Sequence, residues 1–117
     1  MSLDFKLKVI REELEEKIDG FPINACHITT RIVSKLTGFE EVGGVYLPSK
    51  LFHAWNYDPV NKVYVDLSMD QFRDCTDRIV VLSMNNYLLK KTDSGTKFQR
   101  KMSDNLLGGF YDISFLR

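Results

Sequence analysis

The chain has 117 residues, of which 44% are hydrophobic and 27% charged, so the composition predicts one compact globular domain over residues 1–117 and excludes a disordered chain. Its 16 basic and 16 acidic residues cancel, and neither nucleic acid nor an anionic membrane is an expected partner without an overall positive field. No apolar run approaches the roughly 20 residues that span a bilayer, and the first residues lack the apolar stretch of a signal peptide, so we expect a cytoplasmic protein.

Two helices come first in the predicted fold. Over residues 3–18, apolar side chains recur at helical spacing, and Gly20 and Pro22 end the segment. A second helix is predicted over residues 24–37, with Asn24 capping its first amides and Gly38 as its stop signal. This arrangement puts Cys26 in the first turn of a helix.

The pattern then changes to that of strands. Residues 42–47 predict a strand in which Gly43-Gly44 marks either a bulge or a place where another backbone comes close. Residues 51–57 and 62–67 predict a hairpin joined by the turn 58–61, and residues 78–83 a further strand. We expect an exposed loop at 90–96, a helix at 97–107, and a short strand or packed tail at 110–116. The predicted class is α+β, with the N-terminal helices packed on a mostly antiparallel sheet.

Cys26 is the candidate nucleophile. The start of a helix favours the thiolate form of a cysteine, because unpaired N–H groups and the positive end of the helix dipole lie there. A thiol nucleophile also needs an imidazole within reach, and the imidazole needs a carboxylate to orient it. His27 neighbours Cys26 on the helix but points away from it, so we read His27 as a rim or surface histidine.

The hairpin supplies both remaining groups. If the turn occupies 58–61, Tyr57 pairs with Lys62 and His53 lies directly opposite Asp66. Opposite residues share a face with Cβ atoms roughly 4.5–5.5 Å apart, within reach of an imidazole–carboxylate hydrogen bond. Trp55 lies one pleat from His53 on the same face, where an aromatic ring would exclude water. We predict a Cys26–His53–Asp66 triad.

The order of these groups resembles a known superfamily. Three stretches carry the likeness: Asn24-Ala25-Cys26-His27, His53-Ala54-Trp55-Asn56, and the run from Tyr64 to Phe72 with its Asp-Leu-Ser and Asp-Gln-Phe elements. A cysteine at a helix start, a histidine on a strand and an aspartate on the next strand are similar to the transglutaminase-like core and, more distantly, to papain-like peptidases and arylamine N-acetyltransferases. The likeness covers residues 20–72, and the Gly-Ser-Cys-Trp signature of papain relatives is absent.

The resemblance implies a papain-like or transglutaminase-like core and a thiol-dependent hydrolase or acyl-transferase. Cys26 would form a thioester from an amide of a peptide or protein, His53 would carry the proton, and Asp66 would orient His53. Hydrolysis by a peptidase, amidase or deamidase is the expected outcome, with no cofactor. No glutamine precedes Cys26, so the oxyanion donors would be the Cys26 backbone N–H with Asn24 or Gln71.

Several other readings stay open. The chain could be a catalytically inactive scaffold that binds a peptide or protein beside Trp55 and Gly43-Gly44. It could also be an accessory subunit that docks through the tail from Asn85 onward. Cys26 could be a buried structural cysteine, and Trp55, Phe52 and Phe72 fit a core better than a substrate wall. Cys75 has no evident role, although it could form a disulfide with Cys26. No paired ligand spacing supports zinc, so no metal is expected.

Overall fold

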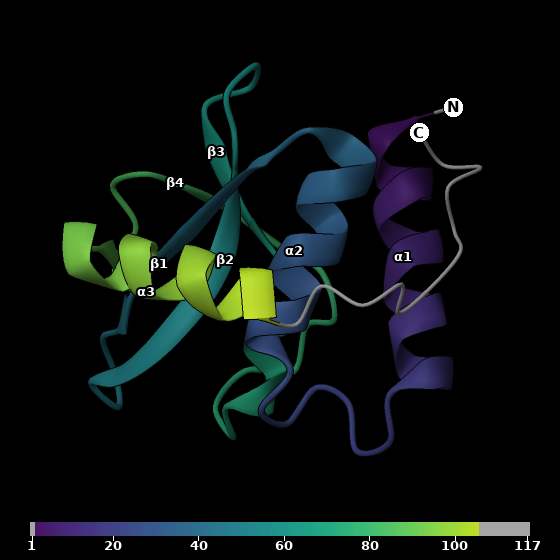
Figure 1. The fold of residues 1–117 in the computed structure, drawn as a ribbon, viewed down its shortest axis with the longest axis horizontal. Coiled ribbons are helices and arrows are strands. Elements are labelled where there is room, and N and C mark those ends of the chain that lie inside the picture. Colours follow the sequence, from purple (N-terminus) through teal and green to yellow (C-terminus); the bar gives the residue numbers. More distant parts are fainter. Residues whose placement is uncertain (1, 106–117) are drawn as a thin grey trace.

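The computed structural model describes residues 2–105 and begins with two helices (Figure 1). Helix α1 spans Leu3–Lys17, and the Ser2 side chain caps it by accepting a hydrogen bond from the Phe5 backbone N–H at 3.2 Å. Helix α2 spans Cys26–Thr37 and ends at Gly38, whose φ of 79° is the left-handed conformation that glycine adopts freely. Both predicted helices are confirmed.

The predicted cap of α2 is wrong. Ala25 is the N-cap of α2 and contributes no side-chain hydrogen bond, whereas Asn24 lies before the helix with a φ of 56°. Asparagine tolerates this left-handed backbone, and here it completes the turn that carries the chain from Gly20 to the helix. Cys26 is nevertheless the first residue of α2, as predicted.

The sheet is antiparallel throughout. Its five strands are β1 (Glu40–Tyr46), β2 (Leu51–Asp58), β3 (Val63–Asp66), β4 (Val80–Ser83) and β5 (Leu89–Lys91), in the order β4-β3-β2-β1-β5. A short 3₁₀ turn, η1 (Met69–Gln71), follows β3. The α+β class, the hairpin and the strand near residue 80 are confirmed.

The glycine pair in β1 allows close backbone approach. Strands β1 and β2 pair in an unbroken register through Gly43 and Gly44, so the strand has no bulge there. A Cβ on Gly43 would lie 2.2 Å from the Gly95 carbonyl oxygen, and one on Gly44 would lie 2.0 Å from the Lys90 carbonyl oxygen. Only glycine lets β5 and the following helix lie this close to β1.

The segment after β4 differs from its prediction. Residues 89–91 form β5 on the edge of the sheet beside β1, and helix α3 spans Asp93–Asn105, so the loop expected at 90–96 is wrong. The expected helix at 97–107 is confirmed over its described part, to residue 105. Residues 110–116 lie outside the described residues. Helix α3 buries small and polar side chains against β1, namely Gly95, Thr96, Gln99 and Ser103.

Alternate residues of the strands face two separate cores. Val65 packs with apolar residues of α1 and α2, whereas its neighbour Tyr64 belongs to a cluster with Trp55 and Tyr46. Helix α2 packs on the sheet, as predicted, and lies beside α1 (Figure 1). The Asn56 side chain of β2 donates to the Thr30 carbonyl of α2 at 2.9 Å. Among residues 2–105, no helix has the length and apolar character needed to cross a bilayer.

Candidate active site

His53 and Asp66 form a buried hydrogen-bonded pair. His53 Nε2 lies 2.6 Å from Asp66 Oδ2, and the two residues are 0% and 2% exposed. The second carboxylate oxygen, Asp66 Oδ1, accepts the backbone N–H of Ser68 at 2.9 Å. Both oxygens are therefore engaged, and the carboxylate is held in one orientation toward the imidazole.

The register that led to this pair was predicted incorrectly, although the contact itself is confirmed. Tyr57 pairs with Tyr64, two residues from the predicted partner Lys62. Asp58 stays in the strand because its side chain accepts two backbone N–H groups of the turn, and the turn occupies residues 59–62. A shift of two residues leaves every side chain on its original face, so His53 and Asp66 meet diagonally instead of directly across.

Cys26 adds a third group at this place. Its side chain is buried at 6% exposure, and it is a free thiol, as is Cys75. Burial lowers the pKa of His53, the charge and hydrogen bond of Asp66 raise it, and interaction with Cys26 raises it further, with a net value of about 10. At neutral pH the imidazole therefore carries both of its ring protons, and the Asp66 carboxylate accepts the one on Nε2.

Gln71 occupies the other ring nitrogen. Its amide Nε2 lies 2.9 Å from His53 Nδ1, and the short η1 turn brings it there. The amide donates to Nδ1 when that nitrogen is unprotonated, and its oxygen must turn to accept when Nδ1 carries a proton. Gln71 thus lies at the imidazole edge that Cys26 needs, and its predicted role as an oxyanion donor stays a prediction.

Aromatic rings enclose the imidazole. The ring centroids of Trp55 and Phe72 lie 6.1 Å and 5.0 Å from that of His53, and Phe72 in turn stacks on Tyr46 at 3.9 Å. Trp55 is 1% exposed, so it belongs to the core, as expected for a large aromatic residue. Cys75 contacts Tyr46, the outer ring of this aromatic group, and its sulfur is 3.1 Å from the Tyr46 hydroxyl.

Asn24 and His27 stand apart from the buried pair. Asn24 is exposed on the loop before α2, and its predicted oxyanion role stays a prediction. The Nδ1 atom of His27 lies 2.5 Å from Gln99 Oε1, so this histidine is satisfied by α3, in agreement with its predicted structural role.

Sequence reasoning missed an anchor of the site. Arg11 of α1 is 3% exposed and binds Asp70 through two parallel hydrogen bonds of 2.7 Å, and it also donates to the Leu67 carbonyl oxygen at 2.9 Å. These contacts hold the segment between Asp66 and Gln71 against α1. An arginine four residues after Leu7, on the buried stripe of the helix, was the available signal.

Within residues 2–105, no three His, Cys, Asp or Glu side chains gather into a group that could hold a metal ion. No family model, curated protein or solved structure matches this chain, so its likeness to the transglutaminase-like and papain-like proteins stays a prediction.

Proposed function

We propose that this chain is a thiol-dependent hydrolase or acyl-transferase that acts on an amide bond of a peptide or protein. The observation that carries the proposal is the fully buried His53, hydrogen-bonded to Asp66 at 2.6 Å and interacting with a cysteine at the first position of a helix. Burying a charged imidazole is costly unless it is paired, so a histidine in this setting supports a role in proton transfer.

In the proposed acylation step, the Cys26 thiolate attacks the carbonyl carbon of the amide. A carbon–sulfur bond forms, and the carbonyl electrons move to oxygen. As the first residue of α2, Cys26 has a backbone N–H without an intrahelical acceptor, and this group would stabilise the oxyanion. The His53 imidazolium then gives its proton to the leaving nitrogen, and the carbon–nitrogen bond breaks. The amine is released, and the acyl group remains on Cys26 as a thioester.

In the second step, the now neutral imidazole takes a proton from water as the water oxygen attacks the thioester. The carbon–sulfur bond breaks, a carboxylic acid is released, and the thiolate–imidazolium pair is restored. An amine in place of water would give acyl transfer. Asp66 accepts a hydrogen bond from His53 Nε2 in both steps, and its negative charge stabilises the charged imidazole.

The test uses iodoacetamide as a probe of thiolate character, in a Cys75→Ser background so that one thiol reacts. We expect iodoacetamide to alkylate Cys26 faster at pH 7 in the parent than in the His53→Gln variant, because the imidazolium stabilises the thiolate. Circular dichroism checks that both variants are folded, and equal alkylation rates in the parent and in His53→Gln would refute the ion pair.

Turnover is tested on casein, with three products measured in parallel. New N-termini would show peptidase activity, ammonia would show deamidation, and incorporated methylamine would show acyl transfer. The Cys26→Ala and His53→Gln variants should lose all three activities. The Cys75→Ser variant should retain them, because Cys75 contacts Tyr46, which is separated from His53 by the ring of Phe72.

A second candidate function is that of a non-catalytic scaffold that binds a peptide or protein. The observation in its favour is the enclosure of the site, since Cys26 is 6% exposed and His53 is 0% exposed. A folded chain whose Cys26 alkylation rate is unchanged by His53→Gln, and which does not turn over casein, would favour the scaffold.

A further inference from the structure

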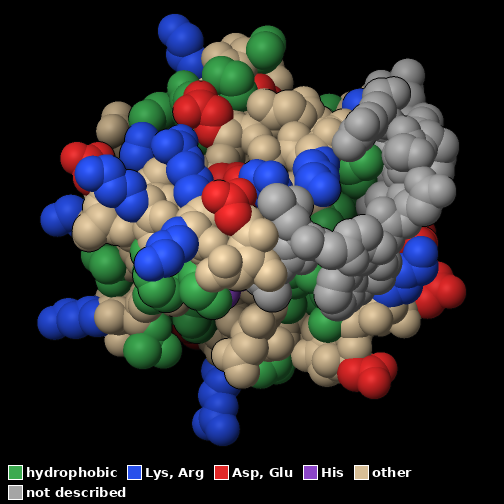
Figure 2. Space-filling view, in the orientation of Figure 1, with side chains coloured by type: hydrophobic (Ala, Val, Ile, Leu, Met, Phe, Trp, Pro, Cys, Tyr) green, Lys and Arg blue, Asp and Glu red, His purple; other side chains and the backbone are tan. Residues whose placement is uncertain are grey.

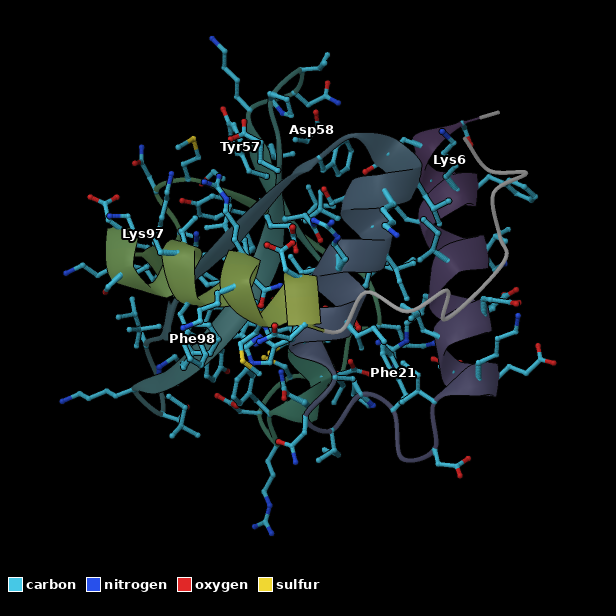
Figure 3. All side chains as sticks on the ribbon, in the orientation of Figure 1. Lys6, Phe21, Tyr57, Asp58, Lys97 and Phe98 are labelled. Atoms are coloured by element: carbon cyan, nitrogen blue, oxygen red, sulfur yellow. The ribbon has the colours of Figure 1, made fainter. Side chains whose placement is uncertain are left out.

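Three aromatic rings, from α2, β2 and α3, meet at the surface. His27 of α2 stacks on Phe52 of β2 at 5.3 Å, and Phe98 of α3 contacts both rings edge-on, at 5.7 Å and 5.0 Å. Phe52 and Phe98 are 36% and 49% exposed, and Figure 3 shows Phe98 beside β2. We refer to these three residues as the aromatic cluster.

Two hollows of similar size flank the aromatic cluster. The first has a volume of about 450 Å³, and its wall includes Ile18, Ile23, Asn24, His27, Ile28 and Met102. The second has a volume of about 460 Å³, and its wall includes Gly44, Val45, Phe52, Thr92, Gly95 and Phe98. His27 borders the first hollow and stacks on Phe52, which borders the second, so the cluster is a shared wall between them.

Exposed cations lie on α3 and β5, next to residues that line the second hollow. On α3, Lys97 directly precedes Phe98, and Lys101 lies one helical turn after Lys97. Lys91 lies on β5. Figure 2 shows Lys and Arg side chains gathered over α3 beside a group of hydrophobic side chains. The exposed cations of these two elements are Lys90, Lys91, Lys97, Arg100 and Lys101. Among the contacts between described residues, none of the five forms an ion pair within 4 Å.

The cluster also adjoins the candidate catalytic residues in the chain. His27 directly follows Cys26, and Phe52 directly precedes His53. The first hollow is lined by Asn24, Ala25 and His27, so a polypeptide with a side chain in this hollow would pass the N-terminal end of α2. A small amide would fill one hollow and leave the other unused.

We propose that the aromatic cluster and its two hollows bind an extended peptide segment that carries aromatic or large aliphatic side chains next to acidic residues. The apolar side chains would enter the hollows against Phe52 and Phe98, and the acidic residues would pair with the lysines of α3 and β5. The proposal rests on the proposed function in one respect, that the bound segment is the substrate. Binding itself is measurable without turnover.

A nucleic acid is the less suitable anionic partner. Its affinity depends mainly on many phosphate contacts, and this chain has no net positive charge to support them. The exposed surface of both hollows, moreover, is mainly apolar, which suits apolar side chains better than charged phosphates.

The experiment measures binding to the full chain carrying Cys26→Ala, which cannot form a thioester. The probes are three fluorescein-labelled pools of random dodecapeptides, read by fluorescence anisotropy. The first contains Gly, Ser, Phe, Leu and Glu, the second replaces Glu with Lys, and the third omits Phe and Leu. We expect the first pool to bind at least about tenfold more tightly than either of the others, the size typical of losing an aromatic anchor.

Matched variants locate the site. Phe98→Ala should weaken binding of the first pool about tenfold, whereas Phe5→Ala, which removes an equally exposed ring from α1, should leave it unchanged. Lys97→Glu should reduce the preference for the Glu pool over the Lys pool, and the control Lys8→Glu makes the same charge change on α1. Circular dichroism confirms that each variant is folded.

Each result separates this proposal from the proposed function. Equal binding of all three pools, equal effects of Phe98→Ala and Phe5→Ala, or tighter binding of a labelled dT dodecamer than of the Glu pool would overturn the peptide surface, even if casein is turned over. Selective binding of the Glu pool with no turnover of casein would support the surface and refute the enzyme.

Discussion

At His53, burial and charge act on the same proton in opposite directions. Loss of water around the ring disfavours the imidazolium, while the Asp66 carboxylate and Cys26 favour it, and the second influence is the greater because the pKa rises to about 10. A histidine in an unfolded chain releases this proton near pH 6.5. Folding therefore makes His53 a stronger base.

This difference makes stability depend on pH. Below pH 6.5 both the folded and unfolded chains hold the proton, and the stabilisation from the raised pKa is fully present. Between pH 6.5 and about 10 only the folded chain retains it, so the free energy of unfolding should fall with rising pH, by up to about 1.4 kcal/mol per pH unit. Urea unfolding at pH 7, 8, 9 and 10 measures the slope.

The His53→Gln variant is the control for other groups that titrate over this range, such as tyrosines and lysines. Subtracting its slope from that of the parent isolates His53. A parent slope no steeper than that of His53→Gln would contradict the charged buried imidazole.

The residues of the predicted triad were accessible to sequence reasoning because each depends on a local rule. Cys26 follows a helix-breaking stretch and precedes a helical pattern, and His53 and Asp66 fall on one face of a hairpin by strand alternation. Asn24 failed as a helix cap because its backbone adopts a left-handed turn, which side-chain type alone does not reveal. The approach of Gln71 to His53 depends on how η1 folds back, and this is a tertiary property.

Among the elements, the hairpin shows which part of a register prediction is robust. The turn of the hairpin was predicted one residue too early at each end. Asp58 extends β2, and Lys62 joins the turn with a φ of 56°. The resulting slip of two residues preserved the facing of side chains. A slip of one would have put His53 and Asp66 on opposite sides of the sheet.

Helix α3 shows the opposite case, since its first turn was missed. Apolar periodicity identifies a helix by its buried apolar stripe, but the buried face of α3 consists of Gly95, Thr96, Gln99 and Ser103. Gln99 donates to the His27 carbonyl oxygen at 3.0 Å and to Glu41 Oε1 at 3.1 Å, and Ser103 donates to the same carboxylate oxygen at 2.6 Å. Hydrogen bonds take the place of apolar burial on this helix, and a hydrophobicity pattern cannot detect them.

Replacing Gln99 with methionine should therefore destabilise the protein despite preserving side-chain volume. The His27 carbonyl oxygen would lose its amide partner and the Glu41 carboxylate one of its donors, at a cost of about 2–3 kcal/mol. Urea unfolding measures the change. The control Lys97→Met adds the same side chain to the exposed face of α3, and an equal effect of the two changes would contradict a specific role for the buried amide.

At the scale of the whole molecule, Arg11 joins the N-terminal helix to the segment that completes the candidate site. Its guanidinium binds Asp70, the carbonyl oxygens of Leu67 and Arg78, and Glu15, which also pairs with Arg78. The Arg78 and Arg11 guanidiniums hold the pKa of Glu15 below its usual value, against the opposing effect of burial. A single buried side chain thus connects α1 with the segment from Leu67 to Arg78.

The variant Arg11→Met should lower the free energy of unfolding by about 3 kcal/mol, because it leaves Asp70 and two carbonyl oxygens without their donor. Adding Asp70→Asn should recover part of the loss by removing the unpaired charge. Lys8→Met, on the exposed side of the same helix, serves as the control in urea unfolding. No recovery in the double variant would show that the charge of Asp70 is not the source of the loss.

Because Cys26 is almost completely buried, the reactivity of its thiol reports on motions of the native state. The rate at which a disulfide reagent modifies this thiol in the folded chain therefore measures how readily the native state admits a molecule to Cys26, as the proposed attack on an amide requires. The less buried Cys75 provides an internal reference in the same molecule. Following both thiols in increasing urea would distinguish a small local opening near His53 from unfolding of the entire chain.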